Sequence, residues 1–429
     1  QGTGRTCVVG PLRLVPVFSV SSVSACHDSV VLEQKDKAKE AVVSGVKYVV
    51  SADSHLMEPF DLWTRTLGDK HGEKLPQVID EYRGEKTKFY FTGHEYIKIG
   101  DFEPVDTADS QSGSKSLDED MLAKVDRTNE DPDLRLELMD YDGVSAEIVN
   151  PTYLLYTLRA PDAELVKDCC TVYNDFIADY VSTNPKRMLG TSMIDMEDID
   201  WAVSELERTR KNNLRVTIIN TDVRDGMPPY RDKAYDRFWA AAQDLEVPIT
   251  LHIITGKEQD PYTLQGEDRE VIAQSLIRVL SDVGPVLANE FIFGGIFDRF
   301  PKLQVILGEY EISWLPWYMF RCRQLEGALG QSMDMAPPKR SVDEVMYNNV
   351  WHGVVDDEYF DRAYDVAGAK RIMWGSDFPH PRNTFPNTHA VLDRVFANVP
   401  EEVKIDVAGM NCARLFDLEV PAAAAVAAE

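Results

Sequence analysis

The amino-acid sequence predicts an α/β protein, a (β/α)8 barrel (TIM barrel) with inserted capping segments. Eight short apolar runs, rich in β-branched residues, alternate along the chain with segments of helical periodicity. This alternation is typical of βα units around a parallel sheet, and eight units favour a closed barrel over an open sheet. The runs lie at 48–53, 146–149, 187–191, 214–219, 248–253, 304–307, 349–351 and 371–374.

Three of the intervening segments carry clear helix signals. Residues 162–181 and 199–211 place apolar side chains at i, i+3 and i+4, which is the spacing of one buried helix face. Residues 235–245 repeat this pattern and are introduced by Asp232. We therefore expect helices at these three positions between the predicted strands.

The composition narrows the range of partners. The chain has 429 residues, with 72 Asp and Glu against 45 Lys and Arg, so its formal net charge is −27 at pH 7. Such a chain repels nucleic-acid phosphates and anionic lipid surfaces, and no apolar run approaches the roughly 18 residues of a membrane-spanning helix. The six cysteines are scattered without a CxxC pair, which favours a reduced, cytoplasmic protein. We expect a small-molecule substrate, no nucleic-acid or membrane partner, and a homodimer or higher homo-oligomer.

The barrel is expected to span residues 47–418. Residues 1–46 read as an N-terminal arm or extension, because their apolar stretch is broken by glycine, proline and arginine. Residues 419–429 are rich in alanine and read as a disordered tail.

Two segments are too long for simple βα connections. An insert at about 64–135 contains residues 88–97, which predict a hairpin turning near Gly93. A second excursion covers 255–290. Both leave from the carboxyl ends of strands, which is the catalytic face of a barrel, so we expect both to cap the site.

Polar residues that bind metals follow three of the predicted strands. Asp53 and His55 end the first run and share one face of a strand, His252 ends the fifth, and Asp377 follows the eighth. Each alone is explained more simply, as a helix cap or as a core histidine. Together they supply nitrogen and oxygen ligands suited to zinc or another divalent transition metal, and Glu309 adds a carboxylate at the same level.

Several short motifs occur in an order and spacing that resemble a known family. The chain is similar to the amidohydrolase superfamily, in the amidohydrolase-related branch that contains aminocarboxymuconate-semialdehyde decarboxylase. The resemblance covers roughly Tyr48 to Leu418. Its motifs are Asp53-Ser54-His55-Leu56-Met57-Glu58-Pro59, Thr250-Leu251-His252-Ile253, Phe300-Pro301-Lys302-Leu303, Glu309-Tyr310-Glu311-Ile312-Ser313-Trp314, Trp374-Gly375-Ser376-Asp377-Phe378-Pro379-His380, and Asn411 to Leu415 as the closing N-x-A-R-L.

The resemblance implies a barrel with one divalent metal. By position, the ligands are Asp53 (where many relatives have His or Glu), His55, His252 and Asp377. Asp377 would also transfer a proton, since a carboxylate beside a metal-bound water can accept one. Zinc is the favoured ion, with manganese, iron or cobalt as alternatives.

One departure from the family bears on the reaction. Decarboxylases of the family carry a histidine after the sixth strand, as Leu-Gly-His, whereas this chain has Leu307-Gly308-Glu309. The sequence therefore favours a metal-dependent hydrolase of a small carbonyl- or carboxylate-bearing substrate, with Asp377, Glu309 and His252 as catalytic residues. The alternatives are a non-oxidative decarboxylase of an aromatic or enoic acid, and a non-catalytic barrel with a binding role. The expected substrate-binding residues are Glu58, Arg65, Trp314 and His380.

Overall fold

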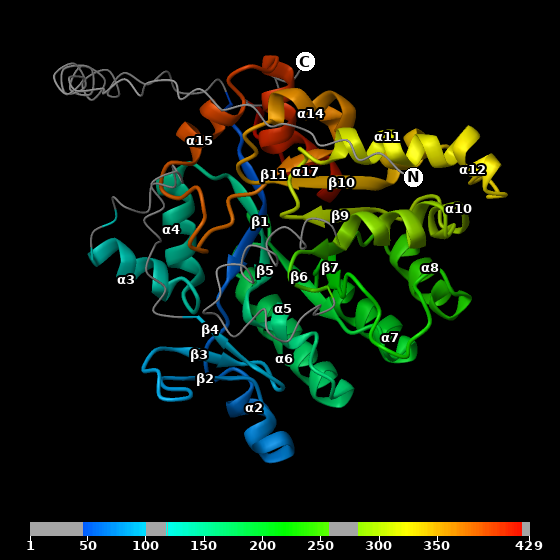
Figure 1. The fold of residues 1–429 in the computed structure, drawn as a ribbon. Coiled ribbons are helices and arrows are strands. Elements are labelled where there is room, and N and C mark those ends of the chain that lie inside the picture. The colour runs from blue at the N-terminus through cyan, green and yellow to red at the C-terminus, as the bar shows by residue number, and fades with distance from the viewer. Residues whose placement is uncertain (1–45, 100–116, 118, 257–281, 423–429) are drawn as a thin grey trace, which may run out of the picture. The chain divides into compact units, whose positions relative to one another are not determined.

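The computed structural model describes residues 46–99, 117, 119–256 and 282–422, and within them it confirms the predicted barrel. Eight parallel strands form one sheet in the order β1-β5-β6-β7-β8-β9-β10-β11 (Figure 1). Every predicted run overlaps one of these strands. Their bounds are β1 Val50–Leu56, β5 Ala146–Pro151, β6 Met188–Ile194, β7 Val216–Ile219, β8 Ile249–His252, β9 Val305–Gly308, β10 Val350–Val354 and β11 Ile372–Trp374.

Helices follow the strands and pack on the outside of the sheet (Figure 1). The predicted helices at 162–181, 199–211 and 235–245 are confirmed as α6, α7 and α8. The side chain of Asp162 accepts a hydrogen bond from an amide of the first turn of α6, so α6 begins at a capping residue. The helices are α5 Tyr153–Thr157, α6 Ala163–Ser182, α7 Ile199–Lys211, α8 Asp236–Asp244, α10 Ile296–Arg299, α11 Leu315–Glu326, α12 Ala328–Ser332, α13 Val342–Asn349, α14 Phe360–Ala367, α15 Thr388–Val395, α16 Glu401–Ile405 and α17 Asn411–Phe416. Among the described helices, none combines the length and the apolar character needed to cross a bilayer.

Hydrogen bonds beyond the last strand complete the ring between β1 and β11. The amide of Asp377 donates to the carbonyl of Asp53 at 2.8 Å, and the amide of His55 donates to the carbonyl of Phe378 at 2.6 Å. Beneath them, the hydroxyl of Ser51 accepts from the amide of Ser376 at 2.9 Å. The candidate ligands on β1 and after β11 are therefore held at a fixed separation by the backbone.

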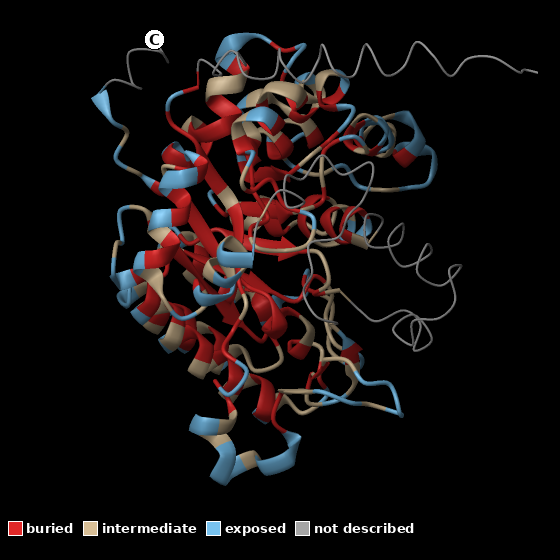
Figure 2. Ribbon diagram, turned by 90° about the vertical axis from the view of Figure 1, so that its left-hand side faces the viewer, coloured by how far each residue is buried: buried red, intermediate tan, exposed pale blue. Residues whose placement is uncertain are grey.

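The amino-terminal end of the barrel is filled by apolar side chains. Residues from seven strands and from α17 form one buried cluster there, which excludes water from this half of the barrel. Figure 2 shows buried residues concentrated along the strands and on the helix faces that meet them. The cluster includes Val50, Ile148, Leu189, Val216, Ile306 and Met373, together with Cys412, Ala413 and Phe416 of α17.

The insert after β1 forms a small antiparallel sheet. Strands β2 (Gln77–Ile79), β3 (Phe89–Phe91) and β4 (Tyr96–Lys98) pair in the order β2-β3-β4, and the predicted hairpin is confirmed because Phe91 pairs with Tyr96. Helix α2 (Thr64–His71) precedes this sheet, and α3 (Glu119–Arg127) and α4 (Pro132–Asp142) lead back to β5.

Several predicted features lie outside the described residues. They are almost all of the arm predicted at 1–46, most of the excursion at 255–290, and residues 423–429 of the predicted tail.

A buried carboxylate links α4 to α15. Asp142, the last residue of α4, accepts hydrogen bonds from the amide of Thr388 at 3.0 Å and from its hydroxyl at 2.6 Å. Burial raises the pKa of Asp142 to about 7, which these hydrogen bonds oppose only in part. The unfolded chain loses this proton near pH 4, so folding becomes less favourable as the pH rises from about 4 to about 7.

Asp142→Asn should remove this pH dependence. The amide oxygen still accepts from the Thr388 amide, but the side chain cannot ionise. Relative to the wild type, the free energy of unfolding of the variant should rise by about 2 kcal/mol between pH 5 and pH 8. Urea unfolding at several pH values measures this change, with Asp140→Asn on the exposed face of α4 as the control. Parallel curves for Asp142→Asn and wild type would refute the assignment.

Candidate metal centre

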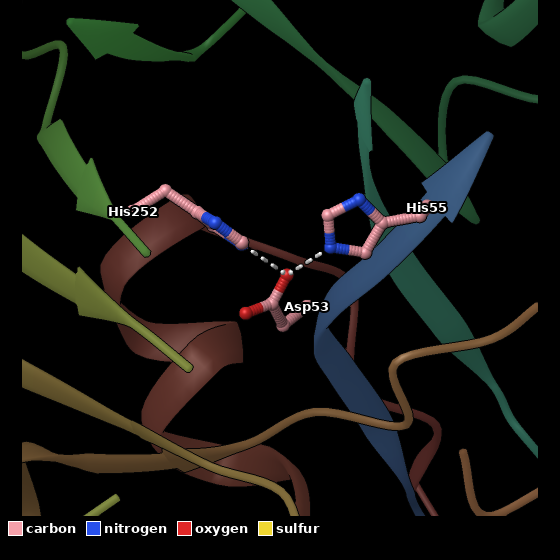
Figure 3. A group of neighbouring side chains, drawn as sticks. All are labelled: Asp53, His55 and His252. Atoms are coloured by element: carbon pink, nitrogen blue, oxygen red, sulfur yellow. Dashed lines mark hydrogen bonds and ion pairs between the residues drawn. The ribbon is translucent and has the colours of Figure 1, made fainter. Parts of the chain in front are cut away.

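The carboxylate of Asp53 lies between two buried imidazoles at the carboxyl end of the barrel. Its Oδ1 is 3.2 Å from Nε2 of His55, which is on the same strand, and 3.4 Å from Nε2 of His252 at the end of β8 (Figure 3). The amide nitrogen of Asn150 on β5 donates to the same oxygen at 2.6 Å. Three of the four predicted metal ligands are therefore gathered in one group whose ligand atoms lie within 4.8 Å of one another.

Both imidazoles direct Nε2 towards Asp53 because Nδ1 faces a backbone carbonyl. Nδ1 of His55 is 2.7 Å from the oxygen of Pro151, and Nδ1 of His252 is 3.1 Å from the oxygen of Ile253. A carbonyl can only accept, so Nδ1 carries the proton in each neutral ring and Nε2 is left with a lone pair. This is the tautomer in which histidine ligates a metal through Nε2.

Asp377, the fourth predicted ligand, belongs to a second group that shares His55. Its Oδ1 is 3.6 Å from Nε2 of His55 and 2.7 Å from Nδ1 of His380. The ring of His380 stacks on that of His55 with a centroid separation of 4.0 Å. The structure thus shows two overlapping groups of three rather than a single cluster of four.

Without a bound cation, protons balance the charges of the two groups. Burial raises the pKa of Asp377 to about 8. Burial would also raise the pKa of Asp53, but His252 and His55 outweigh it and hold that pKa below its usual range. Burial alone would lower the pKa of His252, yet Asp53 raises it to about 9. In the absence of metal a proton on His252 therefore offsets the charge of Asp53, and a bound cation would take the place of that proton.

The donor atoms at this point suit a divalent cation. Oδ2 of Asp53 and Nε2 of His55 are buried and have no hydrogen-bond partner among the described residues. Buried polar atoms normally have partners, so these two acceptors indicate a missing positive group. Oδ1 of Asp377, which lies 2.7 Å from Nδ1 of His380, is a further buried oxygen 3.6 Å from Nε2 of His55. Carboxylate oxygen and imidazole nitrogen are ligands that zinc and manganese accept.

Two glycines allow the ligands to approach one another. A Cβ atom at Gly308 would lie 2.6 Å from Cδ2 of His252, and a Cβ at Gly375 would lie 2.5 Å from Cβ of Asp53. Two residues that follow these glycines, Glu309 and Asp377, have φ values of 64° and 56°. This left-handed conformation is uncommon outside glycine and is found where a site over-determines the backbone.

Glu309 lies at the end of β9, within electrostatic reach of the ligand groups. Burial, and next the carboxylate of Asp377, raise the pKa of Glu309 well above its ordinary value. The side chain is not part of either ligand group.

Two predicted substrate-binding residues, Arg65 and Trp314, lie outside both ligand groups. Arg65 is on α2, a helix with no buried residue, and its side chain is half exposed. Its guanidinium lies 3.6 Å from the carboxylate of Asp61. The indole of Trp314 donates to the carbonyls of Tyr310 and Glu311 and serves packing at the start of α11. The roles of Arg65 and Trp314 in substrate binding remain predictions.

Glu58 is buried, and its carboxylate accepts hydrogen bonds from the amides of Thr152, Tyr153 and Leu154 at 2.9–3.1 Å. It therefore holds the turn between β5 and α5, and it also lines a cavity. His380, the fourth predicted substrate-binding residue, contacts Asp377 and Thr152.

Two cavities flank α5 at this end of the barrel, and the insert hairpin lines both. The first has a volume of about 340 Å³ and is bordered by His94, Arg159, Asn220 and Thr255. The second has a volume of about 360 Å³ and is bordered by Glu58, Lys88 and Tyr153. Thr255 also donates its hydroxyl to the carbonyl of His252 at 2.8 Å, so the first cavity adjoins the ligand-bearing strand.

Sequence reasoning missed the residues that support the ligands. Asn150 follows an apolar strand and resembles a turn residue, so its contact with Asp53 had no local signal. Glu147 did carry a signal, because it is a charged residue within a buried strand, and it pairs with the buried Arg135.

Comparison with known proteins places the chain among amidohydrolases. A family model described as Amidohydrolase matches residues 94–418. The gamma-resorcylate decarboxylase of Polaromonas sp. (strain JS666) is 28% identical over 275 residues, which cover 60% of this chain and 81% of that protein.

Two solved structures share the fold at 18% identity. An amidohydrolase from Mycobacterium avium subsp. paratuberculosis K-10 matches with a TM-score of 0.67 over 87% of this chain and 100% of its own. A dihydroxybenzoic acid decarboxylase from Polaromonas sp. JS666, with bound manganese and the inhibitor 2-nitroresorcinol, matches with a TM-score of 0.60 over 88% of this chain and 98% of its own.

His252→Ala should remove bound metal while leaving the fold intact. The ring is one of two neutral nitrogen donors to the site, whereas the apolar layers of the barrel supply its stability. Metal content after dialysis against manganese or zinc should fall to background, with an unchanged far-ultraviolet circular dichroism spectrum. Full metal occupancy in the variant would rule His252 out as a ligand.

Gly308→Ala tests the close approach of β9 to His252. The added methyl group must displace the imidazole, so metal affinity should fall by about 10- to 100-fold, as for changes to groups that orient ligands. Gly68→Ala on α2 is the matched control, because a Cβ there meets no atom within 4 Å. Equal metal dissociation constants for the two alanine variants would contradict the prediction.

Proposed function

The chain belongs to the amidohydrolase family, and on this premise we propose that it is a metal-dependent enzyme that removes CO₂ from an aromatic acid without an oxidant. The observation that carries the proposal is a pair of buried acceptors without a hydrogen-bond partner among the described residues, Oδ2 of Asp53 and Nε2 of His55, close to the buried carboxylate of Asp377. The similarity to a gamma-resorcylate decarboxylase supports decarboxylation as the reaction.

The proposed reaction is the decarboxylation that the sequence left as an alternative, in place of the hydrolysis that it favoured. The sequence favoured a hydrolase because Glu309 replaces the histidine of family decarboxylases. The similarity to a gamma-resorcylate decarboxylase over 60% of this chain nevertheless favours the decarboxylase alternative.

Asp53, His55 and His252, together with Asp377, would hold one divalent ion. A bound ion would neutralise the substrate carboxylate and an adjacent oxygen and so orient the bond to be broken. Manganese is a candidate beside the zinc favoured by the sequence, because a structural neighbour holds manganese.

Asp377 is the proposed proton donor, and His380 its relay. In the reaction a proton from the Asp377 carboxyl bonds to the ring carbon as the bond to the carboxylate breaks and CO₂ leaves. His380 can return a proton, since its Nδ1 is 2.7 Å from Oδ1 of Asp377 and its Nε2 is 3.0 Å from the hydroxyl of Thr152. Its side chain is 16% exposed, which gives the relay access to water.

Glu309 is proposed to contact the substrate in place of the family histidine. A carboxyl group, like an imidazole, can donate or accept a hydrogen bond according to its protonation state. Its position at the end of β9, near Asp377 and His252, would place it beside the reacting ring.

A substrate panel distinguishes the reactions. The metal-loaded protein is incubated with hydroxybenzoic acids, including 2,6-dihydroxybenzoate, and separately with aryl amides and esters. The proposal predicts CO₂ release from at least one acid. Acid or amine release from the second set alone would restore the hydrolase interpretation, and a protein that binds metal but turns over neither set would favour a binding role.

Asp377→Asn should separate metal binding from turnover. Asparagine keeps an oxygen donor and the hydrogen-bonding shape, but it cannot supply the proton. We expect kcat to fall by about 10²-fold or more, the usual scale for losing a positioned acid–base group, while metal stays bound through Asp53, His55 and His252. Metal content and kcat are measured on the same preparation. Normal turnover with normal metal would exclude Asp377 as the proton donor.

A further inference from the structure

A buried ion pair lies directly behind the metal-ligand strand. Arg135 of α4 and Glu147 of β5 are 0% and 2% exposed. The guanidinium contacts both carboxylate oxygens, through Nε and through Nη2, the latter at 3.1 Å. This two-point geometry fixes the plane of the guanidinium group.

The third donor of this arginine reaches the ligand-bearing backbone. Nη1 of Arg135 donates to the carbonyl oxygen of His55 at 2.7 Å. The amide of His55 in turn donates to the carbonyl of Phe378 at 2.6 Å, and the ring of Phe378 lies 5.3 Å below the guanidinium carbon. One arginine thus contacts both chain segments that meet at the closure of the barrel.

From these contacts we infer that the Arg135–Glu147 pair positions the metal ligands. It holds both the His55 peptide and the segment at Phe378, and Nε2 of His55 and the carboxylate of Asp377 project from these two segments. Glu147 orients the guanidinium, so that Nη1 points at His55. The inference rests on the proposed function, because it concerns residues that would hold the cation.

A purely stabilising role makes a different prediction. Replacing a buried ion pair by apolar side chains of similar volume is often neutral or stabilising for a fold, because the desolvation of two charges is avoided. If the pair serves only stability, its apolar replacement should leave the metal centre unchanged. If it positions His55, the apolar replacement should fold and yet bind metal poorly.

The deciding experiment combines Arg135→Met with Glu147→Leu. Manganese dissociation constants are measured by calorimetry for wild type and for the folded double variant, and visible absorption of the cobalt(II)-loaded proteins reports ligand geometry. We expect a melting temperature close to that of wild type, an affinity weakened by about 10- to 100-fold, and an altered cobalt spectrum. A folded double variant with wild-type affinity and spectrum would overturn the inference.

Arg135→Lys gives an independent test should the double variant fail to fold. Lysine keeps the charge beside Glu147 but lacks the planar fork that reaches His55 at the same time. We expect it to fold and to lose about 10-fold in affinity, and wild-type affinity would again overturn the inference. Asp140→Asn, which breaks the ion pair of α4 with Arg187, is the control and should bind manganese normally. Failure of wild type itself to bind metal would instead refute the proposed function.

Discussion

The burial of two carboxylates and two imidazoles at one end of the barrel is the constraint that the rest of the site must satisfy. Asp53 and Asp377 are both nearly fully buried, and Oδ2 of Asp53 has no hydrogen-bond partner among the described residues. Two such groups repel each other and lose hydration, so the arrangement is costly unless a cation balances it. The apolar cluster at the amino-terminal end of the barrel stabilises the fold, and this stability offsets the cost of burying charged groups at the opposite end.

The backbone around the site is arranged so that the ligands cannot move apart. The carbonyl of Asp53 and the amide of His55 are both bonded to the segment after β11, so β1 and that segment act as one unit. Gly308 and Gly375 leave room for His252 and Asp53, and the left-handed conformation of Asp377 turns its carboxylate back towards His55. A closed barrel can impose such strained conformations because its strands cannot separate locally.

The fold and the types of ligand residue could be predicted from the sequence. The contacts that hold these ligand residues in place could not. The rhythm of apolar runs located all eight strands, since a buried parallel strand must be apolar along its length. Asp53, His55, His252 and Asp377 stood out because they interrupt or end such runs. The roles of Arg65 and Trp314 in substrate binding remain predictions, because proximity to a motif in sequence does not fix the direction of a side chain. The contacts of Asn150 and Arg135 with β1 join residues about 80 to 97 positions apart, and no local pattern encodes them.

The sequence also could not decide between hydrolysis and decarboxylation. A single substitution, Glu309 in place of the histidine that family decarboxylases carry, led the sequence to favour hydrolysis. That prediction treats the identity of this one residue as deciding the reaction. What the step requires is a group near Asp377 and His252 that can exchange a hydrogen bond or a proton with the substrate, and a carboxyl group supplies both. Glu309 lies at the end of β9, within electrostatic reach of both residues, so the substitution is compatible with the proposed decarboxylation.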